Sequence, residues 1–262
     1  MLALIFATCN RISLDDLKND NSGNVRLILS LPEGAQPEKL NVQMFDVTGT
    51  NVFDRVQTTS NISSPSFNVA PGTYYLVVVA HSSIRSATIK SPQDVRFTAS
   101  DGQKLTDTFC HCSEIVVGEA PIDVACNMRR ATACIRIVLT DEDIPISFTR
   151  LLITYNGGSA NVNPSTLEGI TKSNQSELRT RNADDTYEVF TFPYMAEYGI
   201  LKMTVTAIAS DGSTITSRTV KEVPVQRDYV TTLSGSLFTG DGWESTFVFS
   251  LEEWKGSFRQ DF

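Results

Sequence analysis

The stretch PIDVACNMRRATACIRIVLT, Pro121–Thr140, carries the pattern on which the fold of this chain depends. Apolar residues alternate through Ile122–Cys126 and again through Ala131–Leu139, as they do in half-buried strands. Between these two runs, Met128–Arg130 contains no glycine or proline that would make a turn. The pattern therefore predicts that the last strand of one domain continues into the first strand of the next. We call Pro121–Thr140 the seam.

The size and composition of the chain indicate a folded protein with room for two domains. The chain has 262 residues, of which 41% are hydrophobic and 20% charged, as in globular proteins. Valine, isoleucine, threonine, phenylalanine and tyrosine dominate the apolar runs, and hardly any segment has a helical period. The net charge of -8 and the lack of a basic stripe argue against a nucleic-acid partner.

The strand pattern before the seam is repeated after it. Val25–Leu31 is followed by Leu40–Phe45 much as Cys134–Thr140 is followed by Arg150–Tyr155, at an offset of about 110 positions. Two units of short strands with turns between them predict an all-β protein made of tandem β-sandwiches, at 25–128 and 129–262. One larger sandwich with insertions is the alternative. The other expected strands are Thr73–Ala80, Ser86–Ile89, Phe109–Val117, Ile200–Ala209, Val220–Val225, Tyr229–Leu237 and Thr246–Leu251. The polar stretch Asn161–Asp185 is expected to form a surface loop.

The N-terminal segment has two interpretations. Met1–Cys9 is a short apolar run that ends in a cysteine and is too short to span a bilayer. It resembles the end of a bacterial lipoprotein signal whose start lies upstream, in which case Cys9 is acylated. The other interpretation is a plain apolar N-terminus. On the first interpretation, residues 1–24 are a truncated signal followed by a flexible leader.

No set of residues predicts an active site, a metal site or a cofactor. His81 follows an apolar strand and is expected to be a solvated residue at a strand end. The adjacent residues Cys110, His111 and Cys112 cannot converge on a metal, because side chains alternate between the faces of a strand. Cys110, Cys112, Cys126 and Cys134 are expected to be buried thiols, with two disulfides as the alternative. The acidic run Asp141–Asp143 is expected to be a solvated turn.

A family resemblance rests on VRLILSL, LNVQMFDVTGT and APGTYYLVVVAH, on the seam followed by RLLITYNGGSANVNPSTLEG, and on EVPVQRDYVTTLSGSLFTG. Together these segments resemble the fimbrial subunit families of Bacteroidales, especially the anchor and accessory branch. The resemblance covers about Gly23–Gly240. Its most specific parts are the seam with the following strand and the closing segment EVPVQRDYVTTLSGSLFTG. It implies two transthyretin-like domains in a surface lipoprotein that assembles with other fimbrial subunits by strand addition. In polymerising subunits an arginine is cleaved in the loop after the first strand. Here that loop, Pro32–Lys39, has no arginine, which favours an anchor or accessory subunit.

The resulting hypothesis is a non-enzymatic fimbrial subunit that is tethered to the outer membrane through Cys9. Its partners would be other fimbrial subunits, with a host or bacterial surface ligand as a further candidate. A glycan-binding surface lipoprotein is the alternative function. The candidate strand-exchange residues lie in the first and last strands and are Val25, Leu27, Leu29, Phe247, Phe249 and Leu251.

Overall fold

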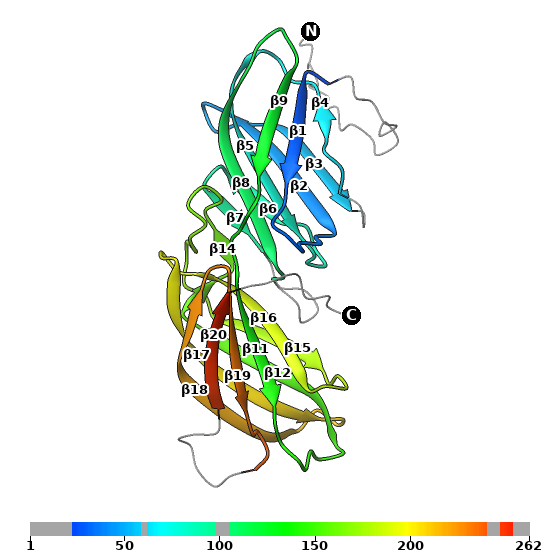
Figure 1. The fold of residues 1–262 in the computed structure, drawn as a ribbon, viewed down its shortest axis with the longest axis vertical. Coiled ribbons are helices and arrows are strands. Elements are labelled where there is room, and N and C mark those ends of the chain that lie inside the picture. The colour runs from blue at the N-terminus through cyan, green and yellow to red at the C-terminus, as the bar shows by residue number, and fades with distance from the viewer. Residues whose placement is uncertain (1–22, 59–61, 98–104, 240–246, 254–262) are drawn as a thin grey trace, which may run out of the picture.

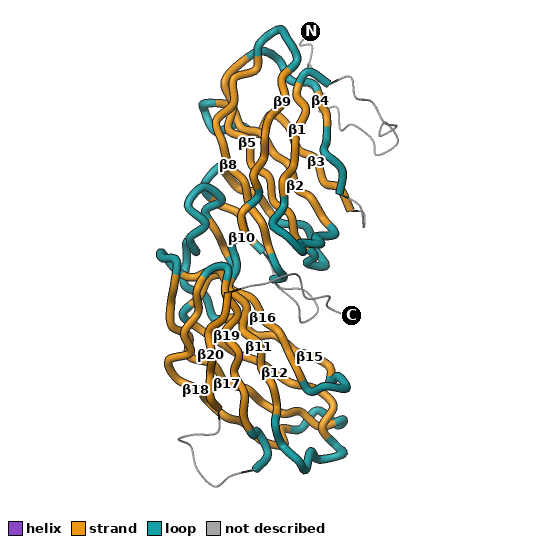
Figure 2. The backbone as a smooth tube through the Cα atoms, viewed as in Figure 1, coloured by secondary structure: helices purple, strands orange, loops and turns teal. Residues whose placement is uncertain are grey.

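The computed structural model describes residues 23–58, 62–97, 105–239 and 247–253, and these residues form an all-β protein. Figures 1 and 2 show strands and connecting loops, with no helix in the part of the chain that is described. The expected fold class is therefore confirmed. The strands form two groups stacked along the long axis of the molecule, with β1–β10 above β11–β20, except that β14 lies beside β7 of the upper group (Figure 1).

In the upper group, two sheets face each other across a shared core. One sheet has the order β4-β1-β9 and the other the order β10-β8-β5-β2-β3. Alternate residues of β1 and β2, such as Leu27 and Val42, are fully buried between the sheets. This is the arrangement of a β-sandwich. The strands are β1 (Val25–Ser30), β2 (Lys39–Asp46), β3 (Asn51–Thr58), β4 (Ser66–Phe67), β5 (Gly72–His81), β6 (Thr88–Ser91), β7 (Asp94–Arg96), β8 (Thr108–Val117), β9 (Ile122–Asn127) and β10 (Arg129–Arg130).

The lower group repeats the order of the upper one. Its sheets are β13-β16-β11-β19-β20 and β15-β12-β17-β18, and they enclose a core that includes Ile135 and Ile153. β1 runs parallel to β9, and β11 runs parallel to β19. The strands are β11 (Ala133–Leu139), β12 (Phe148–Asn156), β13 (Gly158–Ser159), β14 (Asn161–Val162), β15 (Gln175–Thr180), β16 (Thr186–Pro193), β17 (Tyr198–Ala209), β18 (Thr214–Gln226), β19 (Tyr229–Gly235) and β20 (Phe247–Glu253). We propose two domains close to the expected division 25–128 and 129–262. The pairing of β10 (Arg129–Arg130) with β8 assigns these two residues to the upper group.

The seam crosses three sheets and is not one continuous strand. β9 pairs with β1, β10 pairs with β8 in the facing sheet, and β11 pairs with β16 and β19 in the lower group. Pairing is interrupted at Met128 and at Ala131–Thr132. The sequence pattern predicted the extended conformation. It could not show the interruptions, because each results from a change of partner sheet.

The two groups meet through a third hydrophobic core and a small shared sheet. The hairpin β6–β7 covers one face of the upper sheet β10-β8-β5-β2-β3. Strand β7 also pairs with β14 of the lower group, with Val95 opposite Val162. Buried residues from both groups, including Phe97 and Phe192, pack together there. A large hydrophobic contact of this kind restricts relative motion of the groups.

The expectation of a surface loop over Asn161–Asp185 is wrong. The segment contains β14 and β15, and β15 pairs with β12 along its whole length. Gln175 and Glu177 of β15 are buried despite their polarity, because partners in neighbouring strands bind both side chains. Strands β3 and β16 were also not among those expected from the sequence.

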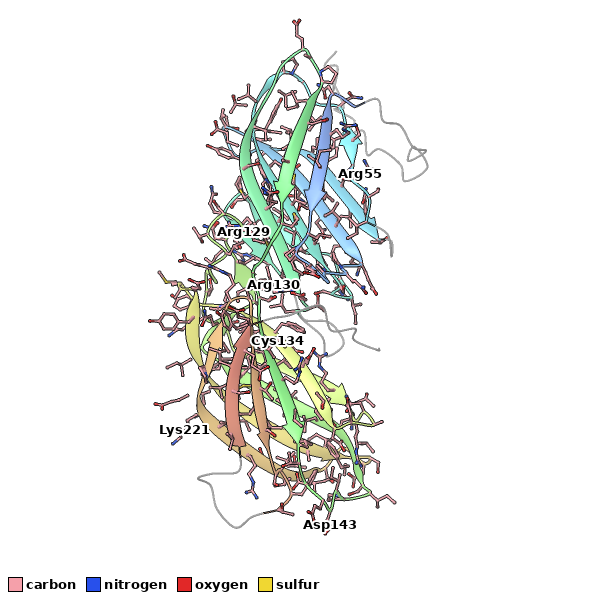
Figure 3. The ribbon with its side chains drawn as sticks, viewed as in Figure 1. Arg55, Arg129, Arg130, Cys134, Asp143 and Lys221 are labelled. Atoms are coloured by element: carbon pink, nitrogen blue, oxygen red, sulfur yellow. The ribbon has the colours of Figure 1, made fainter. Side chains whose placement is uncertain are left out.

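Arg130 connects the two groups at the seam (Figure 3). Its guanidinium binds both carboxylate oxygens of Asp107 at 2.9 and 3.2 Å, and it binds Asp228 Oδ1 at 2.5 Å. Asp107 precedes β8, whereas Asp228 lies in the turn between β18 and β19. Only 3% of the Arg130 side chain is exposed, so this ion pair is shielded from solvent on the arginine side.

Candidate strand-exchange elements

β1 is a central strand that completes the upper core. It pairs with β9 over its whole length, but with β4 only at Val25 and Arg26. Val25 and Leu27 are fully buried, and Leu29 is half-buried against the same core. The alternate residue Ile28 is 43% exposed. Removal of β1 would therefore expose the apolar residues on which Val25 and Leu27 pack.

β20 is the edge strand of its sheet in the lower group. It runs antiparallel to β19, from the pair Tyr229–Glu253 to the pair Gly235–Phe247. The exposed fractions of Val248 and Leu251 are 74% and 41%. Phe249 occupies the register position opposite Leu233, and the structure does not describe the side chains of Phe247 and Phe249.

Asp141 holds the segment that leads from β19 toward β20. Its carboxylate accepts hydrogen bonds from the backbone N–H groups of Leu237, Phe238 and Thr239 at 2.6, 2.9 and 3.0 Å. The Thr239 hydroxyl adds a fourth bond at 3.1 Å. Asp141 was expected to lie in a solvated turn. This interaction could not be predicted from the sequence, because the partners of Asp141 lie about a hundred positions away. The carboxylate instead stabilises the exit of β19.

The remaining candidates are not brought into a common site. Cys9 lies outside the described residues. Cys110, Cys112, Cys126 and Cys134 are free thiols, and burial raises the pKa of Cys110 to about 12. Within the described ranges, no three His, Cys, Asp or Glu side chains are grouped as metal ligands. Likewise, the described residues contain no helix long and apolar enough to cross a membrane.

His81 is buried, and the expectation of a solvated strand-end residue is wrong. The backbone N–H groups of Ser83 and Ala87 point at its Nδ1 and Nε2, at 3.0 and 3.2 Å, and Asn41 Oδ1 also lies 3.0 Å from Nε2. The ring packs edge-on against Phe97 at the contact between the two groups. Desolvation by burial, together with the nearby Lys39 ammonium, lowers the pKa of His81 to about 3. The imidazole is therefore neutral in the folded protein.

The burial of His81 predicts a loss of stability in mild acid. Below about pH 6.5 the unfolded chain protonates this histidine, whereas the folded chain does so only near pH 3. Acidification from pH 7 to 5 is therefore expected to lower the free energy of unfolding by about 2 kcal/mol through His81 alone. Urea titrations at both pH values measure this. His81→Gln should be less stable at pH 7 but lose about 2 kcal/mol less on acidification. An equal loss in both proteins would contradict the prediction.

The facing sheets, with side chains of β1 buried between them in the upper group and β20 at a sheet edge in the lower group, define an all-β protein of the β-sandwich class. Residues 86–248 match the model of DUF6562, a family of unknown function. The match covers more than half of the chain, which therefore belongs to this family. None of the curated proteins matches the sequence.

Several solved structures with a similar fold come from Bacteroides species. A putative adhesin from Bacteroides ovatus is 14% identical, with a TM-score of 0.54 over 83% of this chain and 88% of that one. A putative adhesin from Bacteroides thetaiotaomicron is 11% identical, with a TM-score of 0.51 over 88% and 95% of the two chains. A structure described as putative polysaccharide binding, from the same species, is 10% identical, with a TM-score of 0.51 over 88% and 98%. Because the identities are only 10–14%, these similarities show a shared fold alone.

Proposed function

We propose that this protein is a non-enzymatic fimbrial subunit of the anchor or accessory kind. It would be tethered to the outer membrane through an acylated Cys9 and would bind neighbouring subunits by β-strand addition. The fold shared with structures described as adhesins supports a role at the cell surface. In strand addition, the backbone ladder supplies affinity and alternate side chains fill pockets of the acceptor.

The observation that carries the proposal is the position of the terminal strands. β1 places Val25 and Leu27 in the upper core and has a full ladder only on the side of β9. Among the described strands, β20 pairs only with β19. Strand β1 is thus suited to leave a groove in the upper group when it is displaced, and β20 is suited to extend its sheet by pairing with a further strand.

The test combines the mature N-terminus with partner capture. Mass spectrometry of the protein from membranes should find acylated Cys9, and Cys9→Ser should release the protein from the membrane fraction. Deletion of residues 247–262 should abolish copurification of other fimbrial subunits. A soluble wild-type protein with an unmodified Cys9 would exclude the anchor role. Unchanged copurification after the deletion would exclude β20 as the partner element.

A glycan-binding adhesin is a second candidate, favoured by one exposed aromatic residue. Tyr198 is 72% exposed, more than any other aromatic side chain in the described part of the chain, and Ile200 beside it is 61% exposed. Sugar faces stack on aromatic rings presented in this way. A glycan array in which Tyr198→Ala abolishes a binding signal of the wild type would favour this function over assembly.

A further inference from the structure

β16 has an edge that none of the described strands covers along most of its length. The N–H of Leu139 donates to Asp185 O at 3.1 Å, which places the odd-numbered backbone groups of β16 on the side of β11. The carbonyls of Thr186, Glu188 and Phe190 therefore face the opposite side. Among the described strands, β13 pairs on that side only with Phe192 and Pro193.

Side chains, not a strand, occupy these three carbonyls. Asn182 Nδ2 donates to Thr186 O at 2.5 Å, and Arg179 Nη2 donates to Glu188 O at 3.0 Å. The Tyr155 hydroxyl donates to Phe190 O at 2.8 Å. Tyr155 and Arg179 come from β12 and β15 of the facing sheet, and Asn182 comes from the link between β15 and β16. The three carbonyls are thus used in order along the strand, from an exposed bond at Thr186 to a buried one at Phe190.

The donors are themselves fixed in place. Arg179 also binds Glu177 Oε2 at 2.5 Å, and Glu177 is fully buried. The hydroxyl of Tyr155 has one proton, and Phe190 O is the nearest of its acceptors, with Glu177 Oε1 at 3.0 Å. Burial and the neighbouring Glu177 raise the pKa of Tyr155 well above its ordinary value, so the phenol stays a donor.

The upper group contains one hydrogen bond of the same kind, from a side chain of one sheet to a backbone carbonyl of the facing sheet. Arg55 of β3 donates through Nη1 to Ser66 O of β4 at 3.2 Å. β3 and β4 hold the places in their sheets that β15 and β16 hold in the lower group. In both groups an arginine of one sheet, Arg55 of β3 or Arg179 of β15, thus binds a carbonyl of the facing strand, β4 or β16.

We propose that Tyr155, Arg179 and Asn182 close the β16 edge against strand addition by a second copy of this chain. An incoming strand needs free edge carbonyls as acceptors for its N–H groups, and here each acceptor already has a donor. This inference goes beyond the proposed function and does not depend on it. It implies that partner strands must add elsewhere.

The test removes the side-chain donors from the β16 carbonyls and measures whether copies of the chain then pair along this edge. The variant combines Tyr155→Phe, Arg179→Met and Asn182→Ala with Glu177→Gln, which avoids leaving a buried carboxylate without Arg179. We expect its mass by light scattering to rise about twofold with concentration relative to the unchanged chain, because open edges pair. We also expect the amide of Glu188, which faces this edge, to exchange about tenfold more slowly in the associated form.

Tyr187→Phe is the matched control. It removes a hydroxyl from the same strand, but that hydroxyl binds Asp185 Oδ1 at 3.2 Å and no edge carbonyl. Its mass should not change. If the fourfold variant does not fold, Tyr155→Phe with Asn182→Ala keeps the Arg179–Glu177 pair and opens two of the three carbonyls. A folded variant that keeps the mass of the unchanged chain, or that associates without protecting Glu188, overturns the proposal.

Discussion

A chain that starts at Pro32 is expected to lose the cooperative unfolding of its upper group, and a peptide covering Asn24–Leu31 is expected to restore it. The truncation removes Val25 and Leu27, each fully buried and each contributing about 2 kcal/mol or more of hydrophobic stabilisation. It also removes the six-residue ladder with β9. Together these losses approach the whole stability of a small domain, about 5–15 kcal/mol. Calorimetry of the truncated chain, with and without peptide, measures the effect.

Two altered peptides separate specific refilling of the groove from nonspecific binding. A peptide with Leu27→Asp places a charge in the core and should not restore unfolding cooperativity. A peptide with Ile28→Asp changes a side chain that is 43% exposed and should restore it nearly as well as the native peptide. If the truncated chain melts like the full-length protein, β1 does not complete the core and cannot be an exchange element.

Arg130→Met is expected to lower the free energy of unfolding by about 3 kcal/mol, because it leaves Asp107 without its bidentate partner at the junction of the two groups. Loss of one partner of a shielded pair costs more than loss of the pair, so adding Asp107→Asn should recover part of the stability. Chemical denaturation of the single and double variants measures both effects.

Arg26→Met is the matched control for Arg130→Met. Arg26 also pairs with an aspartate, Asp123, but the two side chains are 49% and 55% exposed. An exposed pair of this kind contributes less than about 1 kcal/mol. Similar losses for Arg26→Met and Arg130→Met would show that burial at the seam adds nothing to the Arg130 interaction.

The candidate strand-exchange residues were predictable to different degrees. Alternation in Val25–Leu31 indicated that Val25, Leu27 and Leu29 share one face, and the structure buries that face in the upper core. The position of β1 between β4 and β9 was not predictable, because parallel pairing with β9 joins residues about a hundred positions apart. The roles of Phe247 and Phe249 in strand exchange and the acylation of Cys9 stay predictions.

The sequence by itself determined the strands that alternate clearly, such as β1 and β11, and their duplication, because alternation of apolar residues is a local property of the chain. It did not determine β3, β15 or β16. Only the tertiary structure decided which polar residues are buried. Glu177 and His81, both buried, and the half-buried Asp141 look like ordinary surface residues in the sequence. A polar group enters the interior only where hydrogen-bonding partners meet it, and those partners lie on other strands or far along the chain. The same long-range pairing closes the β16 edge and divides the seam among three sheets.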